Sequence, residues 1–377
     1  MWTKTPLLYS ESISSRLGCN VFLKLETLQP TLNFKQRSQT KFAKQQFEKH
    51  GSSLHLVMAS GGNAAFALAY AAHTLGVKCT VFIPREAGKK IALDALRRWG
   101  TETIVDGDCY QDALSRAHEF ASKHENAVMG SPYEYPVLWE GVSTMVDEIA
   151  EQLPSDASPP AAILCSVGGG SLLGGMLLGC NRHGWENTRI IAVETQGAES
   201  TYSSIMAAEG SPDSLGWDRN IQTHVDEETG VTVATLAKVT TRATSLGSVI
   251  TAPGVLKMAL DRRAKGKGKY EGGLTTVSIP DELAMLSGLS FLDEHKIMVE
   301  LASSATLSPI YSPQLFREIF GVSTTANRLE EKPKTLVFIV CGGFKITASE
   351  METYRKELEA GGVDGKLAFV DGMRVDL

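Results

Sequence analysis

The 377-residue sequence has little cysteine, and its cysteines follow no recognisable pairing. Six are scattered singly, with no CxxC pair and no histidine at metal-ligand spacing. This absence excludes a zinc site of the usual kind and a disulfide framework. The first residues also lack the apolar stretch followed by small residues that a secretory signal needs. We therefore expect a reducing, cytoplasmic location.

Long charged runs of one sign are absent as well. Lys and Arg number 37 against 43 Asp and Glu, which gives a net charge of −6, and the one basic run, Lys265–Lys269, is interrupted by glycine. A protein that follows a phosphate backbone needs a concentrated basic surface. The sequence therefore predicts no nucleic-acid partner.

One segment is long and uncharged enough to be tested as a membrane span. Ala161–Cys180 carries no charge, but six of its residues are glycine, three of them in succession. Successive glycines would break a lipid-exposed helix. We expect a strand, a tight turn and a helix instead, and no membrane partner.

Short apolar runs rich in β-branched residues alternate with longer helical patterns along most of the chain. The runs are VFLKLE, LHLVMAS, CTVFIP, AAILCSV, RIIAVET and LVFIVCGG. This alternation predicts an α/β fold with mainly parallel sheets covered by helices. The length allows two domains.

A glycine cluster, Gly168-Gly169-Gly170, stands between a predicted strand and a helix that begins near Ser171 and Leu172. Successive backbone N–H groups at a helix N-terminus can cradle an anion such as phosphate. The cluster matches neither the P-loop nor the dinucleotide fingerprint. Close packing of the helix on the strand is the alternative explanation.

Two further features lie at predicted helix starts. The turn Ser60–Asn63 has small and short polar residues suited to holding a carboxylate, with a plain helix cap as the alternative. Lys35 follows Asn33 and Phe34 at a helix start, where the helix dipole disfavours its positive charge. It is a candidate nucleophilic amine, unless it is a solvated surface lysine.

These features, in this order and with Cys341-Gly342-Gly343 after the last strand, resemble the fold-type II pyridoxal-phosphate enzymes, which share the tryptophan synthase β-like fold. Within them the chain is most similar to the serine/threonine dehydratases of the animal liver type. The stretches that carry the resemblance are LKLETLQPTLNFK, VLWEGVSTMVDEI, CSVGGGSLLGGM, AVETQGAES, HKIMVELASSA and VFIVCGGF. The resemblance implies a homodimer. Each chain would have two doubly wound domains, a large one of residues 1–35 and 136–377 and a small one of residues 36–135.

The resemblance also implies roles for individual residues. Lys35 would form the Schiff base with pyridoxal 5′-phosphate and later act as the base at the substrate α-carbon. The substrate would contact Asn33, Ser60, Gly61, Gly62 and Asn63. The cofactor would contact Phe34, Lys35, Asn63, Gly168, Gly169, Gly170, Ser171, Leu172, Cys341 and Gly342. A monovalent cation, K⁺ being the candidate, would bind to Gly168, Glu194, Ala198 and Ser200, unless Glu194 is instead a salt-bridged carboxylate.

Cys341 would face the pyridine nitrogen of the cofactor. A thiol with an ordinary pKa of about 8.5 is mostly neutral and would not keep that nitrogen protonated. The ring is then a weaker electron sink, which favours rapid loss of a β leaving group over racemisation or transamination.

The implied activity is β-elimination of water from L-serine, with L-threonine as a second substrate. Released aminoacrylate would hydrolyse to the 2-oxo acid and ammonia. Three alternatives stay open at this point: β-replacement on serine or an activated serine, a metabolite-binding protein without turnover, and a dinucleotide-dependent oxidoreductase.

Departures from the family pattern limit the substrate assignment. The stretch that usually reads Ser-Gly-Ser-Phe-Lys is Thr31-Leu32-Asn33-Phe34-Lys35 here, and the residue after Cys-Gly-Gly is Phe344 rather than Ser or Thr. These changes favour a reshaped pocket, in which the replacement reaction is the main competitor of elimination.

Overall fold

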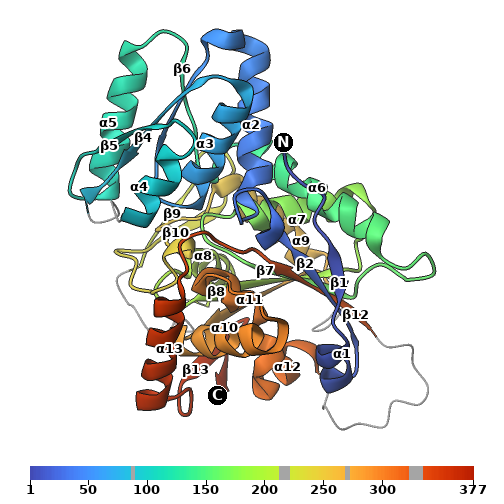
Figure 1. The fold of residues 1–377 in the computed structure, drawn as a ribbon. Coiled ribbons are helices and arrows are strands. Elements are labelled where there is room, and N and C mark those ends of the chain that lie inside the picture. The colour runs from blue at the N-terminus through green and yellow to red at the C-terminus, as the bar shows by residue number, and fades with distance from the viewer. Residues whose placement is uncertain (86–89, 212–220, 268–271, 322–333) are drawn as a thin grey trace.

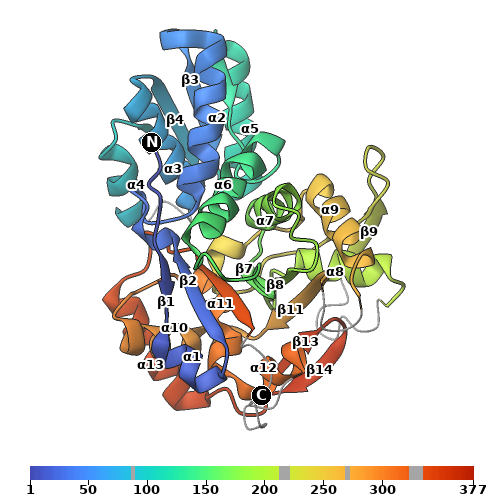
Figure 2. The same cartoon turned by 90° about the vertical axis from the view of Figure 1, so that its right-hand side faces the viewer.

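The chain folds around two separate β-sheets with helices on their faces (Figures 1 and 2). The structure, a computed structural model, describes residues 1–85, 90–211, 221–267, 272–321 and 334–377. The larger sheet has eight strands in the order β1-β2-β12-β7-β8-β11-β13-β14, and the smaller has four in the order β5-β4-β3-β6. A hairpin of β9 and β10 stands apart from both sheets.

The strands of the larger sheet are β1 (Leu7–Tyr9), β2 (Asn20–Leu25), β7 (Ala162–Ser166), β8 (Arg189–Thr195), β11 (Leu274–Ile279), β12 (Thr335–Val340), β13 (Leu367–Val370) and β14 (Met373–Asp376). The remaining strands are β3 (His55–Ala59), β4 (Lys78–Ile83), β5 (Glu102–Val105), β6 (Ala127–Met129), β9 (Gln222–Val225) and β10 (Thr232–Thr235). All pairs within the smaller sheet are parallel, and so are those from β2 through β12, β7 and β8 to β11. Within the larger sheet, the antiparallel pairs of the described strands lie toward its two edges, and the β9–β10 hairpin is antiparallel as well. The predicted α/β fold with mainly parallel sheets is confirmed.

The helices are α1 (Glu11–Leu17), α2 (Lys35–His50), α3 (Asn63–Leu75), α4 (Lys90–Arg97), α5 (Tyr110–Lys123), α6 (Pro136–Gln152), α7 (Ser171–Arg182), α8 (Ser200–Ala208), α9 (Pro253–Ala264), α10 (Asp281–His295), α11 (Leu301–Tyr311), α12 (Pro313–Phe320) and α13 (Ala348–Gly361). The uncharged segment 161–180 is β7, a turn and most of α7, as predicted. Among the described residues, none of the helices has the length and apolar character that crossing a bilayer requires.

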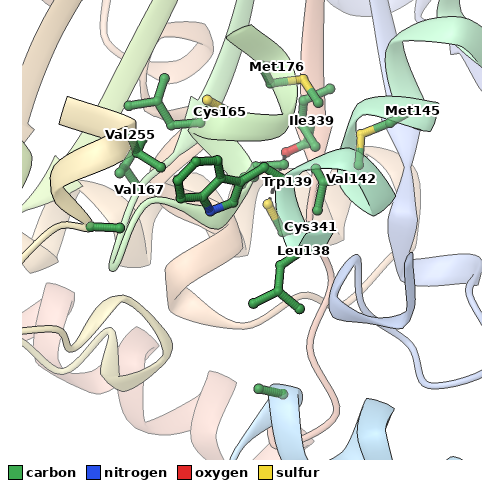
Figure 3. Packing of buried hydrophobic residues seen from close by; sticks show 14 of the residues in the cluster. Leu138, Trp139, Val142, Met145, Cys165, Val167, Met176, Val255, Ile339 and Cys341 are labelled. Carbon is green, nitrogen blue, oxygen red and sulfur yellow. Dashed lines mark hydrogen bonds between the residues drawn. The ribbon is translucent and has the colours of Figure 1, made fainter. Parts of the chain in front are cut away.

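Alternation along the central strands divides the apolar core into two layers. In β12, Val337 and Ile339 point to the layer that also contains α6 and α7, whereas Leu336 and Phe338 point to the layer under α10 and α11. Because side chains alternate along a strand, Cys341 continues the face of Ile339. Figure 3 shows its thiol among the side chains of that layer, below Trp139 and Val142.

The same core layer extends from the larger sheet to the smaller one. It contains Leu56 and Met58 of β3 together with residues of α2, α3, α6 and α7. The four strands of the smaller sheet all lie between residues 55 and 129, inside the segment predicted as the small domain. The domain boundaries themselves stay a prediction. Of the basic run, Lys265–Lys267 follow α9 and are exposed, and the rest lies outside the described residues.

A buried ionic cluster joins the start of α2 to the larger sheet. The Arg37 guanidinium donates to both carboxylate oxygens of Glu26 at 2.8 Å and to both oxygens of Glu148 at 2.7 Å. The Lys24 ammonium donates to Glu148 at 2.6 Å and to the Thr5 carbonyl at 2.7 Å. Two cations face two anions, so the cluster is neutral as a whole.

Hydrogen bonds within the cluster offset the cost of burying its four charges. The side chains of Arg37 and Glu26 have no exposed surface, and a buried charge is costly unless it is paired and hydrogen-bonded. Burial alone would raise the pKa of Glu148, but its bonds to Arg37 and Lys24 hold that pKa below its ordinary value. Glu148 thus stabilises the fold above pH about 4.5, and this contribution is lost as pH falls through the lowered pKa.

We predict that Arg37→Met lowers the free energy of unfolding by about 3 to 5 kcal/mol, because it leaves buried carboxylates without their partner. Urea unfolding measures the change. The matched control is Arg182→Met, which removes an exposed pair with Asp147 and is expected to cost below about 1 kcal/mol. Equal losses for the two variants would contradict a special role of the buried cluster.

Candidate active site

The candidate site lies where neighbouring parallel strands of the larger sheet end. In the order β2-β12-β7-β8, the residues after these strands are the Asn33–Lys35 turn, Cys341, the glycine loop and the segment that leads into α8. Carboxyl ends of parallel strands share one edge of a sheet, which is where ligands bind in open α/β folds. The fold therefore brings together the motifs that the sequence singled out.

The turn before α2 holds Lys35 in place through backbone and side-chain contacts. The Asn33 side chain accepts a hydrogen bond from the Lys35 backbone N–H at 3.0 Å and donates to the Thr31 carbonyl. The Phe34 N–H donates to the Cys341 carbonyl at 3.2 Å. Asn33 is almost fully buried, so in this arrangement its amide serves the turn. Its predicted contact with substrate stays a prediction.

The amine of Lys35 reaches the beginning of α7. Its Nζ lies 2.6 Å from Ser171 Oγ and 2.6 Å from the Pro132 carbonyl oxygen, and both accept a hydrogen bond from it. Burial lowers the pKa of Lys35 to about 7, because desolvation disfavours the charged form. The amine is therefore largely neutral just above neutral pH, as a nucleophile or base must be.

The glycine loop presents a row of free backbone donors. Within the part of the chain that the structure describes, the N–H groups of residues 168–172 have no hydrogen-bond acceptor. They lie at the N-terminus of α7, where the helix dipole favours an anion. A Cβ on Gly169 would lie 2.3 Å from the Tyr133 ring, so only glycine allows this close approach. The loop is built as an anion cradle.

Cys341 is the third group that faces this edge. Its thiol is buried, 3.5 Å from Ser166 Oγ, and burial raises its pKa to about 12. Gly342, which follows it, has φ of +80° and forms a bridge with Asn33. A Cβ on Gly342 would lie 2.2 Å from the Leu32 carbonyl oxygen. The thiol is thus held neutral in a turn that is locked against the turn of Lys35.

Asn63 links the smaller sheet to the larger one across the site. Its amide nitrogen donates to both Glu300 oxygens at 3.1 and 3.2 Å and to Ser245 at 3.2 Å, and its oxygen accepts from the Phe344 N–H. Glu300 also accepts from the Ser245 hydroxyl and from the Lys345 N–H at 3.0 Å. Glu300 is buried and accepts hydrogen bonds from Asn63, Ser245 and Lys345, so it connects the two sides of the site.

The predicted cation ligands gather beside the glycine loop. Strands β7 and β8 are paired, so Gly168 lies near Glu194, and Ser200 begins α8. The Glu194 carboxylate accepts the backbone N–H groups of Thr201 and Tyr202 at 2.9 and 2.7 Å. Burial raises the pKa of Glu194 to about 8. The carboxylate therefore caps α8 as well as facing this region.

Sequence reasoning missed several contacts of the site. Pro132, Tyr133 and Ser245 come from loops whose sequences carry no motif, so their placement depends on the tertiary fold. Lys345 could have been found from the sequence, because it follows the Cys-Gly-Gly motif by two residues. The departures Leu32 and Phe344 both line an open cavity of about 600 Å³ that also includes Phe66 and Arg98.

The residues present fit pyridoxal phosphate. The cradle of unpartnered N–H groups suits its phosphate, and the uncharged Cys341 thiol is compatible with an unprotonated ring nitrogen. The Lys35 amine, whose pKa burial lowers to about 7, suits its aldehyde.

Comparison with known proteins agrees with this fit. The family model described as "Pyridoxal-phosphate dependent enzyme" matches residues 1–342. A rat (Rattus norvegicus) protein named "Serine dehydratase-like" is 32% identical over 354 residues, covering 94% of each chain. The mouse (Mus musculus) "L-serine dehydratase/L-threonine deaminase" is 32% identical over 360 residues, covering 96% of this chain and 97% of that one.

A solved structure extends the similarity to the fold. The fungal L-serine ammonia-lyase from Rhizomucor miehei superposes with a TM-score of 0.76 at 28% identity, covering 94% of this chain and 98% of that one. The matched family model spans most of the chain, including the Lys35 turn, the glycine loop and Cys341. The chain therefore belongs to the family of pyridoxal-phosphate dependent enzymes, with the fold of the fold-type II group.

Proposed function

We propose that this protein is a pyridoxal-phosphate dependent L-serine dehydratase, with L-threonine as a second substrate. The observation that carries the proposal is the Lys35 amine, which lies 2.6 Å from Ser171 at the start of α7 and whose pKa burial lowers to about 7. The relatives named as serine dehydratases and the fungal ammonia-lyase support it. The net reaction converts L-serine to pyruvate and ammonia.

Different residues of the chain would bind the cofactor, bind the substrate and transfer the proton. Gly168–Ser171 would hold the cofactor phosphate, and Ser60–Asn63 would hold the substrate carboxylate at the start of α3. The bound cofactor supplies the electron-withdrawing system that makes the α-hydrogen acidic. Lys35 would attach the cofactor and, once released by substrate, accept the α-proton as a neutral amine. The β-hydroxyl would leave as water by taking up a proton equivalent to the one that Lys35 accepts, so that the protons of the elimination balance.

Cys341 would set the outcome of the reaction. Its buried thiol has a pKa of about 12, so it carries no negative charge that could hold a proton on the ring nitrogen. A weaker electron sink favours departure of the β-hydroxyl over reprotonation of the α-carbon.

A monovalent cation beside the glycine loop and a homodimeric assembly complete the proposal. The Glu194 carboxylate is buried, and a cation such as K⁺ next to it would offset the cost of burying its charge. The carbonyls of Gly168 and Ala198 and the Ser200 hydroxyl are the other proposed ligands. The dimer follows from the resemblance to the liver-type dehydratases.

We expect the purified protein, loaded with cofactor, to release pyruvate and ammonia in equal amounts from L-serine. Lys35→Ala should lower this rate by roughly 10²- to 10⁴-fold, the usual contribution of a positioned base, because among the described residues only the Lys35 amine lies within hydrogen-bond distance of Ser171 at the start of α7. A coupled pyruvate assay measures the rate. If added thiols instead give a new amino acid with no pyruvate, the reaction is β-replacement and the dehydratase assignment is wrong.

We also expect Gly169→Ala to weaken binding of the cofactor by at least roughly 10-fold, because the new Cβ would collide with Tyr133 and displace the phosphate cradle. Dialysis followed by absorption spectroscopy measures the retained cofactor. Gly361→Ala, where the added Cβ meets nothing, is the matched control. Equal retention in both variants would argue against the glycine loop as the phosphate site.

A further inference from the structure

The side chain of Lys345 extends from the Cys-Gly-Gly turn toward the turn at the start of α3. Its Nζ lies 3.9 Å from the position that a Cβ on Gly62 would take. It also donates to Thr244 Oγ1 at 3.2 Å, and the Lys345 backbone N–H is fixed by Glu300 at 3.0 Å. Backbone and side chain are thus both held, and the ammonium group lies beside the Ser60–Asn63 turn.

The turn beneath this ammonium has backbone donors that lack acceptors. Among the described residues, nothing accepts from the N–H groups of Gly61, Asn63 and Ala64, whereas the Gly62 N–H donates to Ser60 Oγ. These free donors lie at the N-terminus of α3, which favours an anion. A cation and a helix N-terminus therefore converge on one small volume.

The positive charge of Lys345 is not cancelled by the protein. Its ammonium forms no ion pair with any carboxylate in the described ranges of the chain. Glu300, which holds its backbone, uses its oxygens to accept from Asn63, Ser245 and the Lys345 N–H. The charge remains available to an anionic ligand.

We propose that Lys345 is a specificity-determining residue that pairs with the α-carboxylate of the amino-acid substrate held at Ser60–Asn63. The inference rests on the proposed function, because it takes that turn as the carboxylate site. Lys345 adds a directed charge to donors that are otherwise backbone N–H groups. Ligands that lack a free carboxylate should gain nothing from it.

The test uses the holoenzyme and two ligands that cannot eliminate, L-alanine and L-alaninamide. Their dissociation constants are measured by the change that binding causes in the visible absorption of the cofactor. Lys345→Met should raise the dissociation constant of L-alanine at least roughly 10-fold and change that of L-alaninamide by less than about twofold. Only L-alanine has a carboxylate that can lose a charge-assisted hydrogen bond to Lys345. Lys345→Arg, which keeps the charge, should recover most of the affinity.

Further measurements separate the charge effect from damage to the fold. In the unchanged enzyme, L-alanine binding should weaken as ionic strength rises, and in Lys345→Met this dependence should be reduced. The matched control, Lys123→Met, removes an exposed positive charge on α5 and should leave the dissociation constants of both ligands unchanged. In the serine assay, Lys345→Met should raise KM by a larger factor than it lowers kcat.

Two results would overturn the inference. If Lys345→Met binds L-alanine as tightly as the unchanged enzyme, or if it weakens both ligands equally, Lys345 does not pair with the carboxylate. Failure of the unchanged enzyme to form pyruvate would instead contradict the proposed function, while the alanine titration would still decide the role of Lys345.

Discussion

The neutral cluster of Lys24, Glu26, Arg37 and Glu148 is the constraint on which the site depends. It joins β2, the turn after it, the first turns of α2 and the helix α6 inside the protein, where the side chains of Lys24, Glu26 and Arg37 have no exposed surface. Lys35 lies two residues before Arg37 on α2. Fixing the guanidinium from two sides therefore fixes the direction from which the Lys35 amine approaches the start of α7.

Burial then sets the chemistry of the site by disfavouring the charged forms of two titratable groups. It lowers the pKa of the Lys35 amine to about 7 and raises that of the Cys341 thiol to about 12. The same low-polarity surroundings strengthen the pull of the α7 N-terminus on an anion. An amine with a lowered pKa, a neutral thiol and an anion cradle together suit a cofactor that carries a phosphate and an aldehyde. Under the proposed function, the neutral thiol would favour elimination over racemisation.

Much of this was predictable from the sequence, because it depends on local patterns. The central strands β7, β8 and β12 are continuous apolar runs, and the three motifs each follow a strand. Other features depend on distant contacts. The antiparallel strands β13 and β14 are short and weakly patterned, so they were not predicted. The hydrogen bonds of the Asn33 amide to its own turn carry no sequence signal, and its contact with substrate stays a prediction. The proposed role of Lys345 depends on the distance of its side chain from Gly62, which only the tertiary fold determines.

Lys35 is proposed to carry the cofactor, and chemical trapping of the bond between them tests this assignment. Holoenzyme is treated with borohydride, which reduces an imine to a stable amine, and the modified lysine is then identified by peptide mass spectrometry. We expect one modified residue, Lys35, with Lys345 and the other lysines unmodified. Modification of a different lysine, or none at all in protein that retains the cofactor, would contradict it.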